Sequence, residues 1–235
     1  MLRGGEHHHL RNVVRIMPGE KIWLIDASGQ HHLARVDLIE KTQTQLSILE
    51  TKKKLIPRVK VTLAQALIKA KKFELIIQKA TELGIWEFQP VIAERSVVKI
   101  DDRHEAKLAR WANIAKEACK QSGVSQIPVV LQPKRLADVL QNRREVLKIC
   151  LNESGGTPMR RFLLPDTMQT RSEIPPASLC VLIGPEGGWT EAEEEDIVSH
   201  GFEAISLGRQ ILRAETAAIS SLAMIDHFWN QDHVS

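Results

Sequence analysis

The sequence contains no tyrosine, and its Phe and Trp residues together make up only 4% of the chain. Proteins that bind single-stranded nucleic acid without sequence preference stack the bases on aromatic side chains. The composition therefore argues against an aromatic stacking platform. A net charge of +3 weakly favours a polyanionic partner, which lysine and arginine would have to hold.

Cysteine is also scarce. Cys119, Cys150 and Cys180 lie far apart, and no CxxC pair occurs. This pattern argues for a reducing compartment and against a disulfide framework or a cysteine-based zinc site. No apolar run approaches the roughly 18 residues that span a bilayer, and the first residues lack the apolar core of a signal peptide. We therefore expect a cytoplasmic protein with no membrane partner.

The nine histidines do not form a metal-binding pattern. His7, His8 and His9 are consecutive, as are His31 and His32, and a β-strand would send neighbouring side chains to opposite faces. No HExxH spacing occurs. We therefore expect no metal.

Two patterns of hydrophobicity divide the chain. Residues 19–50 alternate apolar and polar side chains, which predicts β-strands. Lysines and a proline at 51–58 predict a connector. From residue 59 onward, apolar strands alternate with amphipathic helices, which predicts a mostly parallel sheet with helices on both faces. The expected domains are 1–58 and 59–235.

The expected elements of the second domain follow in chain order. Strands or extended segments are predicted at 59–67, 86–98, 127–131, 145–152, 178–184 and 202–208. Helices are predicted at 71–84, 104–123, 135–143, 190–201 and 213–230, and the first two end at Gly84 and Gly123.

A glycine-rich turn, GPEGG at 184–188, follows one of these strands. Ligands of such sheets bind beyond the carboxyl ends of the strands. A phosphate-binding P-loop would need GxxxxGK[ST], but lysine is missing here and Glu186 would repel a phosphate. The exposed backbone suits a phosphate-free adenosine instead, although a simple tight turn explains the same residues. Thr190 and Glu193 predict a capping box for the next helix.

A second segment, LGRQILRAETA at 207–217, follows the next strand. Ile211 and Leu212 offer apolar walls, while Arg213, Glu215 and Thr216 begin a helix. An ordinary helix start is the alternative interpretation of this segment.

Together, LIGPEGGWT and LGRQILRAETAA resemble the C-terminal signature of the SPOUT-class RNA methyltransferases. HHHLRNVVR, KKFELIIQKATELGIWEFQPVIAERSV and WANIAKEACKQSGVSQIPVV are similar to segments of one family in that class. Its members methylate N3 of a uridine in small-subunit (16S) ribosomal RNA. The resemblance extends over nearly the whole chain, but the basic first strand of the family is missing. Two alternatives are open: the N-terminal barrel is incomplete, or the start of the sequence is assigned too late.

The resemblance implies an α/β protein with an N-terminal PUA-like β-barrel at 1–58 and a SPOUT domain at 59–235. It implies a deep trefoil knot and a cofactor site within about residues 150–230, S-adenosylmethionine as methyl donor, and a homodimer with active sites at the subunit interface. The implied substrate is small-subunit ribosomal RNA within an assembled 30S particle. The cofactor residues carried over are Leu151, Asn152, Gly184, Glu186, Gly187, Gly188, Leu207, Gly208, Ile211, Leu212, Arg213, Thr216 and Ala217.

Uridine N3 must lose its proton before it becomes a good nucleophile, so a base or a cation that stabilises the uridinate must assist. Arg213 is the leading candidate for the cation. Glu117, Gln121 and Ser122 lie near one face of a predicted helix and could approach from the other subunit, although a polar helix end explains them equally well. Glu215 is a candidate base, but a carboxylate at a helix start often serves the helix dipole.

Phosphate contacts are expected from lysine and arginine. Two alternatives remain open: a SPOUT methyltransferase that acts on another RNA or on a 2′-hydroxyl, and a non-catalytic RNA-binding dimer. The missing P-loop lysine disfavours a nucleotide hydrolase. A solvated helix start explains the lysines of KAKK at 69–72 equally well. The expected RNA contacts are Arg3, Arg11, Arg15, Lys69, Lys71, Lys72 and Arg95.

Overall fold

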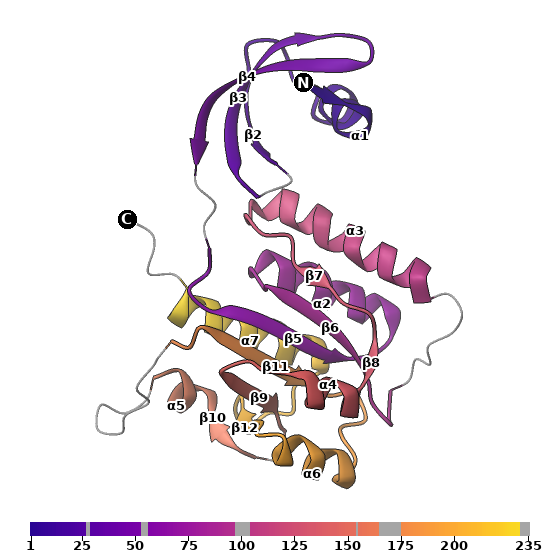
Figure 1. Cartoon of the computed structure of the whole chain (residues 1–235), viewed down its shortest axis with the longest axis vertical. Helices are drawn as coiled ribbons and strands as arrows, with labels where there is room; N and C mark the ends of the chain where they lie inside the picture. Colours follow the sequence, from indigo (N-terminus) through magenta and orange to yellow (C-terminus); the bar gives the residue numbers. More distant parts are fainter. Residues whose placement is uncertain (27–28, 53–55, 97–103, 154, 165–174, 231–235) are drawn as a thin grey trace. The chain divides into compact units, whose positions relative to one another are not determined.

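The computed structural model describes residues 1–26, 29–52, 56–96, 104–153, 155–164 and 175–230. The chain divides into two compact units, Met1–Ile56 and Pro57–Ser235 (Figure 1). Parts of three predicted segments lie outside the described residues: 27–28 of the strand region, 53–55 of the connector and 97–98 of the extended segment.

The smaller unit contains a curled antiparallel sheet in the order β1-β4-β3-β2. The prediction of strands over 19–50 is confirmed by β2 (Lys21–Ile25), β3 (His31–Ile39) and β4 (Gln43–Lys52). β1 (Leu2–Arg3) is a two-residue strand that pairs with β4, so a short strand precedes the histidine motif. Leu10, Ile16 and Val36 form the buried core of this unit.

The structure corrects the strand geometry assumed for the first three histidines. His7 and His8 end helix α1 (Gly4–His8), and His9 begins the π-helix η1 (His9–Val14). The buried His7 ring contacts the Thr44 hydroxyl at 2.8 Å through Nδ1, so it anchors this helix to β4. Within the described residues, no group of three or more histidine, cysteine, aspartate or glutamate side chains could hold a metal ion.

The larger unit is built on an eight-stranded sheet in which every pair is parallel. The strand order is β10-β12-β9-β11-β5-β6-β7, and β8 also pairs with β6. The strands are β5 (Lys60–Ala66), β6 (Glu87–Ile92), β7 (Val129–Val130), β8 (Lys134–Arg135), β9 (Leu147–Leu151), β10 (Thr157–Pro158), β11 (Ser178–Ile183) and β12 (Glu203–Ser206).

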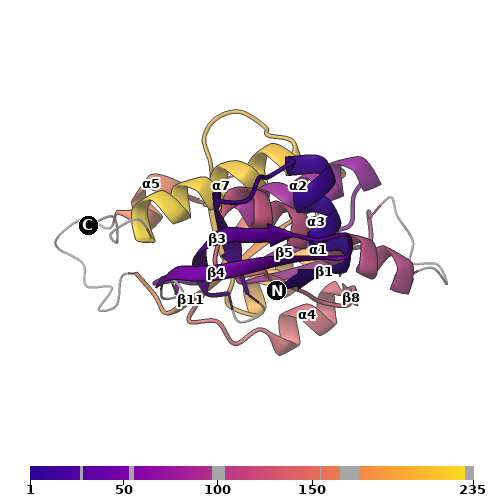
Figure 2. The same ribbon diagram turned by 90° about the horizontal axis from the view of Figure 1, so that it is seen from above.

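Helices cover both faces of this sheet, because its central strands bury side chains on both sides. Leu179, Val181 and Ile183 of β11 face one hydrophobic cluster, and Cys180 and Leu182 face another. Helices α2 and α7 lie on one side of the sheet and α4 on the other (Figure 2). The helices in the described part of this unit are α2 (Ala70–Glu82), α3 (His104–Ser122), α4 (Leu136–Asn142), α5 (Met159–Leu163), α6 (Glu191–Ser199) and α7 (Ala214–Trp229).

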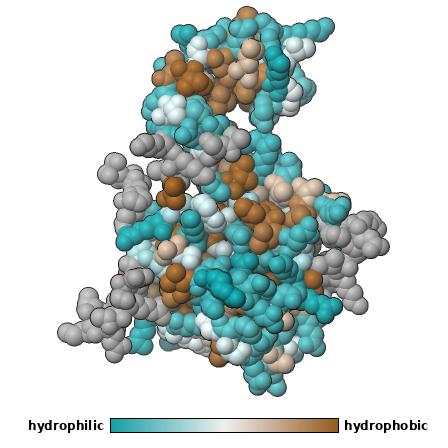
Figure 3. All heavy atoms as spheres, viewed as in Figure 1, coloured by the Kyte–Doolittle hydropathy of each residue, from teal (hydrophilic) through white to brown (hydrophobic). Residues whose placement is uncertain are grey.

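The predicted mostly parallel sheet with helices on both faces is thus confirmed. Gly84 and Gly123 follow α2 and α3 with φ of 72° and 73°, the left-handed conformation expected at a helix end. The acidic α6 accounts for part of the hydrophilic surface at the bottom of Figure 3. Among the described residues, no helix is long and apolar enough to cross a membrane.

Candidate functional site

A cavity of about 750 Å³ opens beyond the carboxyl ends of three neighbouring strands. Residues after β9, β11 and β12 line it, because parallel neighbours end at the same edge of the sheet. We call residues 184–189 the first loop and residues 207–213 the second loop. β11 leads into the first loop, and β12 leads through the second loop into α7.

The structure brings the two glycine-containing motifs together in this cavity. Of the predicted cofactor residues, Thr216 alone does not line it and is exposed on α7. The others that line the cavity are Leu151, Asn152, Gly184, Glu186, Gly187, Gly188, Leu207, Gly208, Ile211, Leu212, Arg213 and Ala217.

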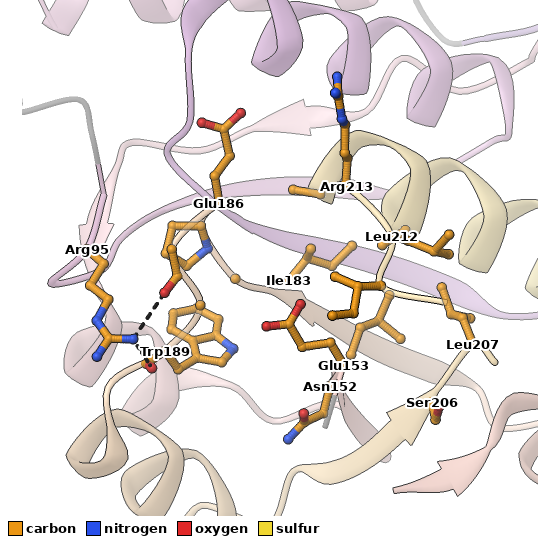
Figure 4. A pocket seen from close by; sticks show the side chains of 18 of the residues that line it. Arg95, Asn152, Glu153, Ile183, Glu186, Trp189, Ser206, Leu207, Leu212 and Arg213 are labelled. Atoms are coloured by element: carbon orange, nitrogen blue, oxygen red, sulfur yellow. Dashed lines mark hydrogen bonds between the residues drawn. The ribbon is translucent and has the colours of Figure 1, made fainter. Parts of the chain in front are cut away.

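Several lining residues were not predicted from the sequence. Pro185, Trp189 and Gln210 lie within or beside the two motifs, so proximity to them was the available signal. Glu153 follows β9, and its carboxylate points into the cavity (Figure 4). The sequence gives no periodic or motif signal for Glu153, because its position depends on how β9 pairs with β11 and β12.

An ion-pair cluster joins the first loop to two helices. Lys72 of α2 donates a hydrogen bond to Glu186 and lies 3.4 Å from a carboxylate oxygen of Glu215 at the start of α7. The hydrogen bond from Lys72 holds the pKa of Glu186 below its ordinary value, and the same bond raises the pKa of Lys72. Glu186, whose charge argued against a phosphate ligand, is thus neutralised by a lysine predicted to bind RNA.

Arg95 fastens the other end of the first loop. It follows β6, and its Nη1 donates to the backbone oxygens of Gly187 and Trp189, both at 3.0 Å (Figure 4). Next to it, the Glu94 N–H donates to the Glu193 carboxylate at 2.8 Å. The predicted capping box of α6 is confirmed, since Thr190 and Glu193 bond to each other's backbone N–H groups.

The second loop has fewer contacts. Ser206 forms hydrogen bonds with the backbone of Gly208, which has a φ of 143°. Ile211 is 77% exposed. Arg213 is the N-cap residue of α7 and is exposed, and its side chain forms no hydrogen bond or ion pair with a described residue. In Figure 4, Arg213 and Glu186 extend in the same direction, away from Asn152.

The remaining predicted catalytic residues lie on α3 and do not line the cavity of this chain. Glu117 pairs with Lys120 at 3.1 Å, and the Ser122 hydroxyl donates to the Ala118 carbonyl at 2.9 Å. Gln121 is exposed at the end of the same helix. Of the predicted RNA contacts, Lys69, Lys72 and Arg95 line the cavity, Lys71 is exposed on α2, and Arg3, Arg11 and Arg15 lie in the smaller unit.

The chemistry available at the cavity is polar and non-covalent. Cys150, in the strand that leads to Leu151, is buried, and burial raises the pKa of its thiol to about 12. Such a thiol is protonated at neutral pH and is a poor nucleophile.

The walls of the cavity combine apolar side chains with unpaired backbone donors. Ile183, Leu207 and Leu212 provide apolar walls, while the backbone N–H groups of Ile211 and Leu212 have no hydrogen-bond partner within the described ranges. A planar, uncharged heterocycle suits such a surface.

Comparison with known proteins identifies relatives of this chain. Residues 55–226 match the family model for the RNA methyltransferase domain. The ribosomal RNA small subunit methyltransferase E of Bacillus subtilis is 34% identical over 230 residues, covering 96% of this chain and 89% of that protein.

Two solved structures are similar over most of their length. One is a ribosomal RNA small subunit methyltransferase E from Neisseria gonorrhoeae bound to S-adenosylmethionine, with 32% identity and a TM-score of 0.80. The match covers 98% of this chain and 92% of that one. The other is a methyltransferase from Legionella pneumophila with bound S-adenosylmethionine, also with 32% identity and a TM-score of 0.80, covering 94% and 88%.

Proposed function

The chain belongs to the RNA methyltransferase family, and we propose that it transfers a methyl group from S-adenosylmethionine to N3 of a uridine in small-subunit ribosomal RNA. The observation that carries this proposal is the meeting of the first and second loops in one cavity, at the edge of the sheet where ligands bind. The relatives named above supply the substrate class and the methyl donor.

The residues of the cavity fit this methyl donor. Ile183, Leu207 and Leu212 would pack against the adenine, and the bare backbone N–H groups of the second loop would bond to its edge. Neither loop offers the lysine of a P-loop, in keeping with a donor that carries no phosphate. Glu153 would place a negative charge in the cavity, which suits a donor that carries a positively charged sulfonium. When bound, the donor supplies an electrophilic methyl group.

Arg213 has the exposure and the free guanidinium that a catalytic cation needs. During transfer, uridine N3 would pass its proton to a base such as Glu215 or to water and would take the methyl group, and the donor would leave as a thioether. Arg213 would stabilise the negative charge on O2 or O4 of the uridine while N3 is deprotonated. Glu215 is a candidate base, and its carboxylate lies 3.4 Å from the Lys72 ammonium.

The proposal includes a homodimer with a trefoil knot around the two loops. Glu117, Gln121 and Ser122 lie away from the cavity of their own chain, so a catalytic role for them requires delivery by a second copy. Ile211 in the second loop is exposed, and a second copy would cover it. The smaller unit would act as a PUA-like RNA-binding domain, with Arg3, Arg11 and Arg15 as phosphate contacts. The 30S particle in the cytoplasm is the proposed substrate.

Methylation of purified ribosomal particles tests this function. Small subunits from cells lacking the gene would be incubated with the protein and S-adenosylmethionine, and the nucleosides then identified by mass spectrometry. We expect 3-methyluridine in the small-subunit RNA. A 2′-O-methylated nucleoside, or methylation of transfer RNA alone, would contradict the proposed specificity and support a methyltransferase with another target. Donor binding without methylation of any RNA would favour a non-catalytic dimer.

A further inference from the structure

Arg95 contacts the first loop through the loop's backbone. Nη1 of a guanidinium carries two hydrogens, and here both are directed at carbonyl oxygens, those of Gly187 and Trp189 at 3.0 Å each. A phosphate approaching Arg95 could therefore use only Nε and Nη2. The geometry matches a side chain that organises protein backbone more closely than one that waits for RNA.

The position of Arg95 is itself well defined. Arg95 belongs to a turn after β6 in which Ala93 and Ser96 bond to each other at 3.1 Å, once through the Ser96 hydroxyl and once through the backbone. The adjacent Glu94 N–H bonds to Glu193, whose carboxylate also caps α6. The turn is thus tied to both the sheet and α6, and it supports Arg95 against the first loop.

The first loop needs such support because three of its six residues are glycine. Glycine loses more backbone freedom on ordering than any other residue, so a glycine-rich loop is costly to hold in one conformation. Gln65 bonds weakly to the start of the loop, from its side-chain amide to the Gly184 oxygen at 3.4 Å. The end of the loop has the two bonds from Arg95.

We propose that Arg95 is a positioning residue for the methyl donor, which fixes the Gly187–Trp189 backbone in the conformation that binds S-adenosylmethionine. This inference rests on the proposed function, and it replaces the expectation that Arg95 is a phosphate contact. Preorganising a loop raises affinity because the ordering cost is met before the ligand arrives. Loss of Arg95 should therefore weaken donor binding and leave the electrostatic part of RNA binding unchanged.

The test compares Arg95→Met with Lys71→Met in the full chain. Both variants lose one positive charge, but Lys71 is exposed on α2 and does not line the cavity. By calorimetric titration with S-adenosylmethionine, we expect the Kd to rise at least about tenfold for Arg95→Met and to stay within about twofold for Lys71→Met. In steady-state assays the KM for the donor should rise, while kcat at saturating donor returns to within about threefold of wild type.

The salt dependence of RNA binding distinguishes a positioning residue from a phosphate contact. A phosphate contact contributes about one unit to the slope of log K against log salt. We expect Arg95→Met to keep the wild-type slope. A slope reduced by about one unit, or unchanged donor affinity, would overturn the proposal.

Two further measurements keep the test decisive. Amide exchange of residues 187–190 without any ligand should be about tenfold faster in Arg95→Met than in wild type, and equal exchange would overturn the inference. This readout holds even if wild type binds no S-adenosylmethionine, a result that would instead refute the proposed function.

If Arg95→Met does not fold, Arg95→Lys is the second variant, because lysine keeps the positive charge but is shorter than arginine. We expect donor affinity at least about threefold weaker for that variant, and wild-type affinity would overturn the proposal.

Discussion

The two loops that line the cavity follow neighbouring parts of one sheet but are held differently. Arg95 bonds to the backbone of the first loop, Lys72 pairs with its glutamate, and Trp189 packs against Gly184. The second loop has hydrogen bonds between Ser206 and the backbone of Gly208, and its Ile211 and Arg213 are exposed.

This difference suggests that the two loops have different roles. The first loop is organised by the rest of the protein before any ligand binds, so it can serve as a fixed surface for the donor. The second loop presents its apolar and cationic side chains to solvent, where RNA or a second copy could meet them. Substitutions in the second loop should therefore affect catalysis, and those that loosen the first should affect binding or stability.

The largest effect is expected for Arg213→Ala. If Arg213 stabilises charge on the uridine in the transition state, its loss should lower kcat roughly 100-fold or more. The fold should be retained, because Arg213 is exposed and its side chain makes no capping hydrogen bond. Single-turnover methylation of small subunits measures the rate, and calorimetry should find donor affinity within about threefold of wild type.

Arg213→Lys serves as the matched control, since it keeps the charge but loses the planar fork. We expect its single-turnover methylation rate to lie between those of wild type and Arg213→Ala. Near-normal methylation by Arg213→Ala would exclude the catalytic role and would leave the second loop without a catalytic cation.

The next prediction contrasts one glycine in each loop. Gly188 has a φ of 68°, a left-handed value that asparagine tolerates, whereas the φ of 143° at Gly208 is accessible almost only to glycine. An added Cβ would meet no atom closer than 3.9 Å at Gly188 or 3.7 Å at Gly208, so backbone strain and not a clash decides the outcome. We expect Gly208→Asn to cost about 1–3 kcal/mol in the free energy of unfolding and Gly188→Asn less than about 1 kcal/mol.

Urea unfolding of both variants would measure this difference, with Gly187→Ala as a control. Gly187 is not in the left-handed region, and an added Cβ would lie 3.5 Å from the Arg95 side chain, an ordinary contact. Equal costs for Gly188→Asn and Gly208→Asn would mean that the second loop relaxes its backbone, which would widen the contrast with the first loop.

The sequence predicts the elements of the larger unit well, because their apolar periods are strong and glycines end α2 and α3. Two-residue strands such as β8 and β10 cannot be predicted from periodicity, since two residues define no period. The helical start of the chain was missed for a related reason. Residues 4–14 carry two glycines and three histidines, and tertiary contacts such as His7 with Thr44 stabilise them.

The sequence predicts the cavity residues that belong to the two glycine-containing motifs. It does not predict those that come from distant segments and lie at the cavity only because of the strand order. The glycines of both loops follow strands, and their common edge follows from a parallel sheet. Arg95 and Lys72 were expected at RNA because their charge suggests phosphate binding. Their contacts with the first loop depend on the order β11-β5-β6, which places the end of β6 near the end of β11 and cannot be inferred from spacing in the chain.

The smallest effect concerns the ion pair that links the first loop to α2. The hydrogen bond from Lys72 lowers the pKa of Glu186 below 4.5, so the folded protein favours its carboxylate more than the unfolded chain does. The resulting stabilisation is present above the unfolded pKa and is lost as pH falls through the lowered pKa of the folded state.

We expect Glu186→Gln to lower Tm by no more than about 3 °C at pH 7, because the pair is partly exposed to solvent. The difference from wild type should shrink as pH falls below 4.5, and it should be smaller at neutral pH in a Lys72→Met background, where Lys69 and Arg213 are the remaining positive charges near Glu186. A difference that does not change with pH would mean that the first loop is held by its backbone bonds to Arg95 and Gln65, with no measurable help from the ion pair.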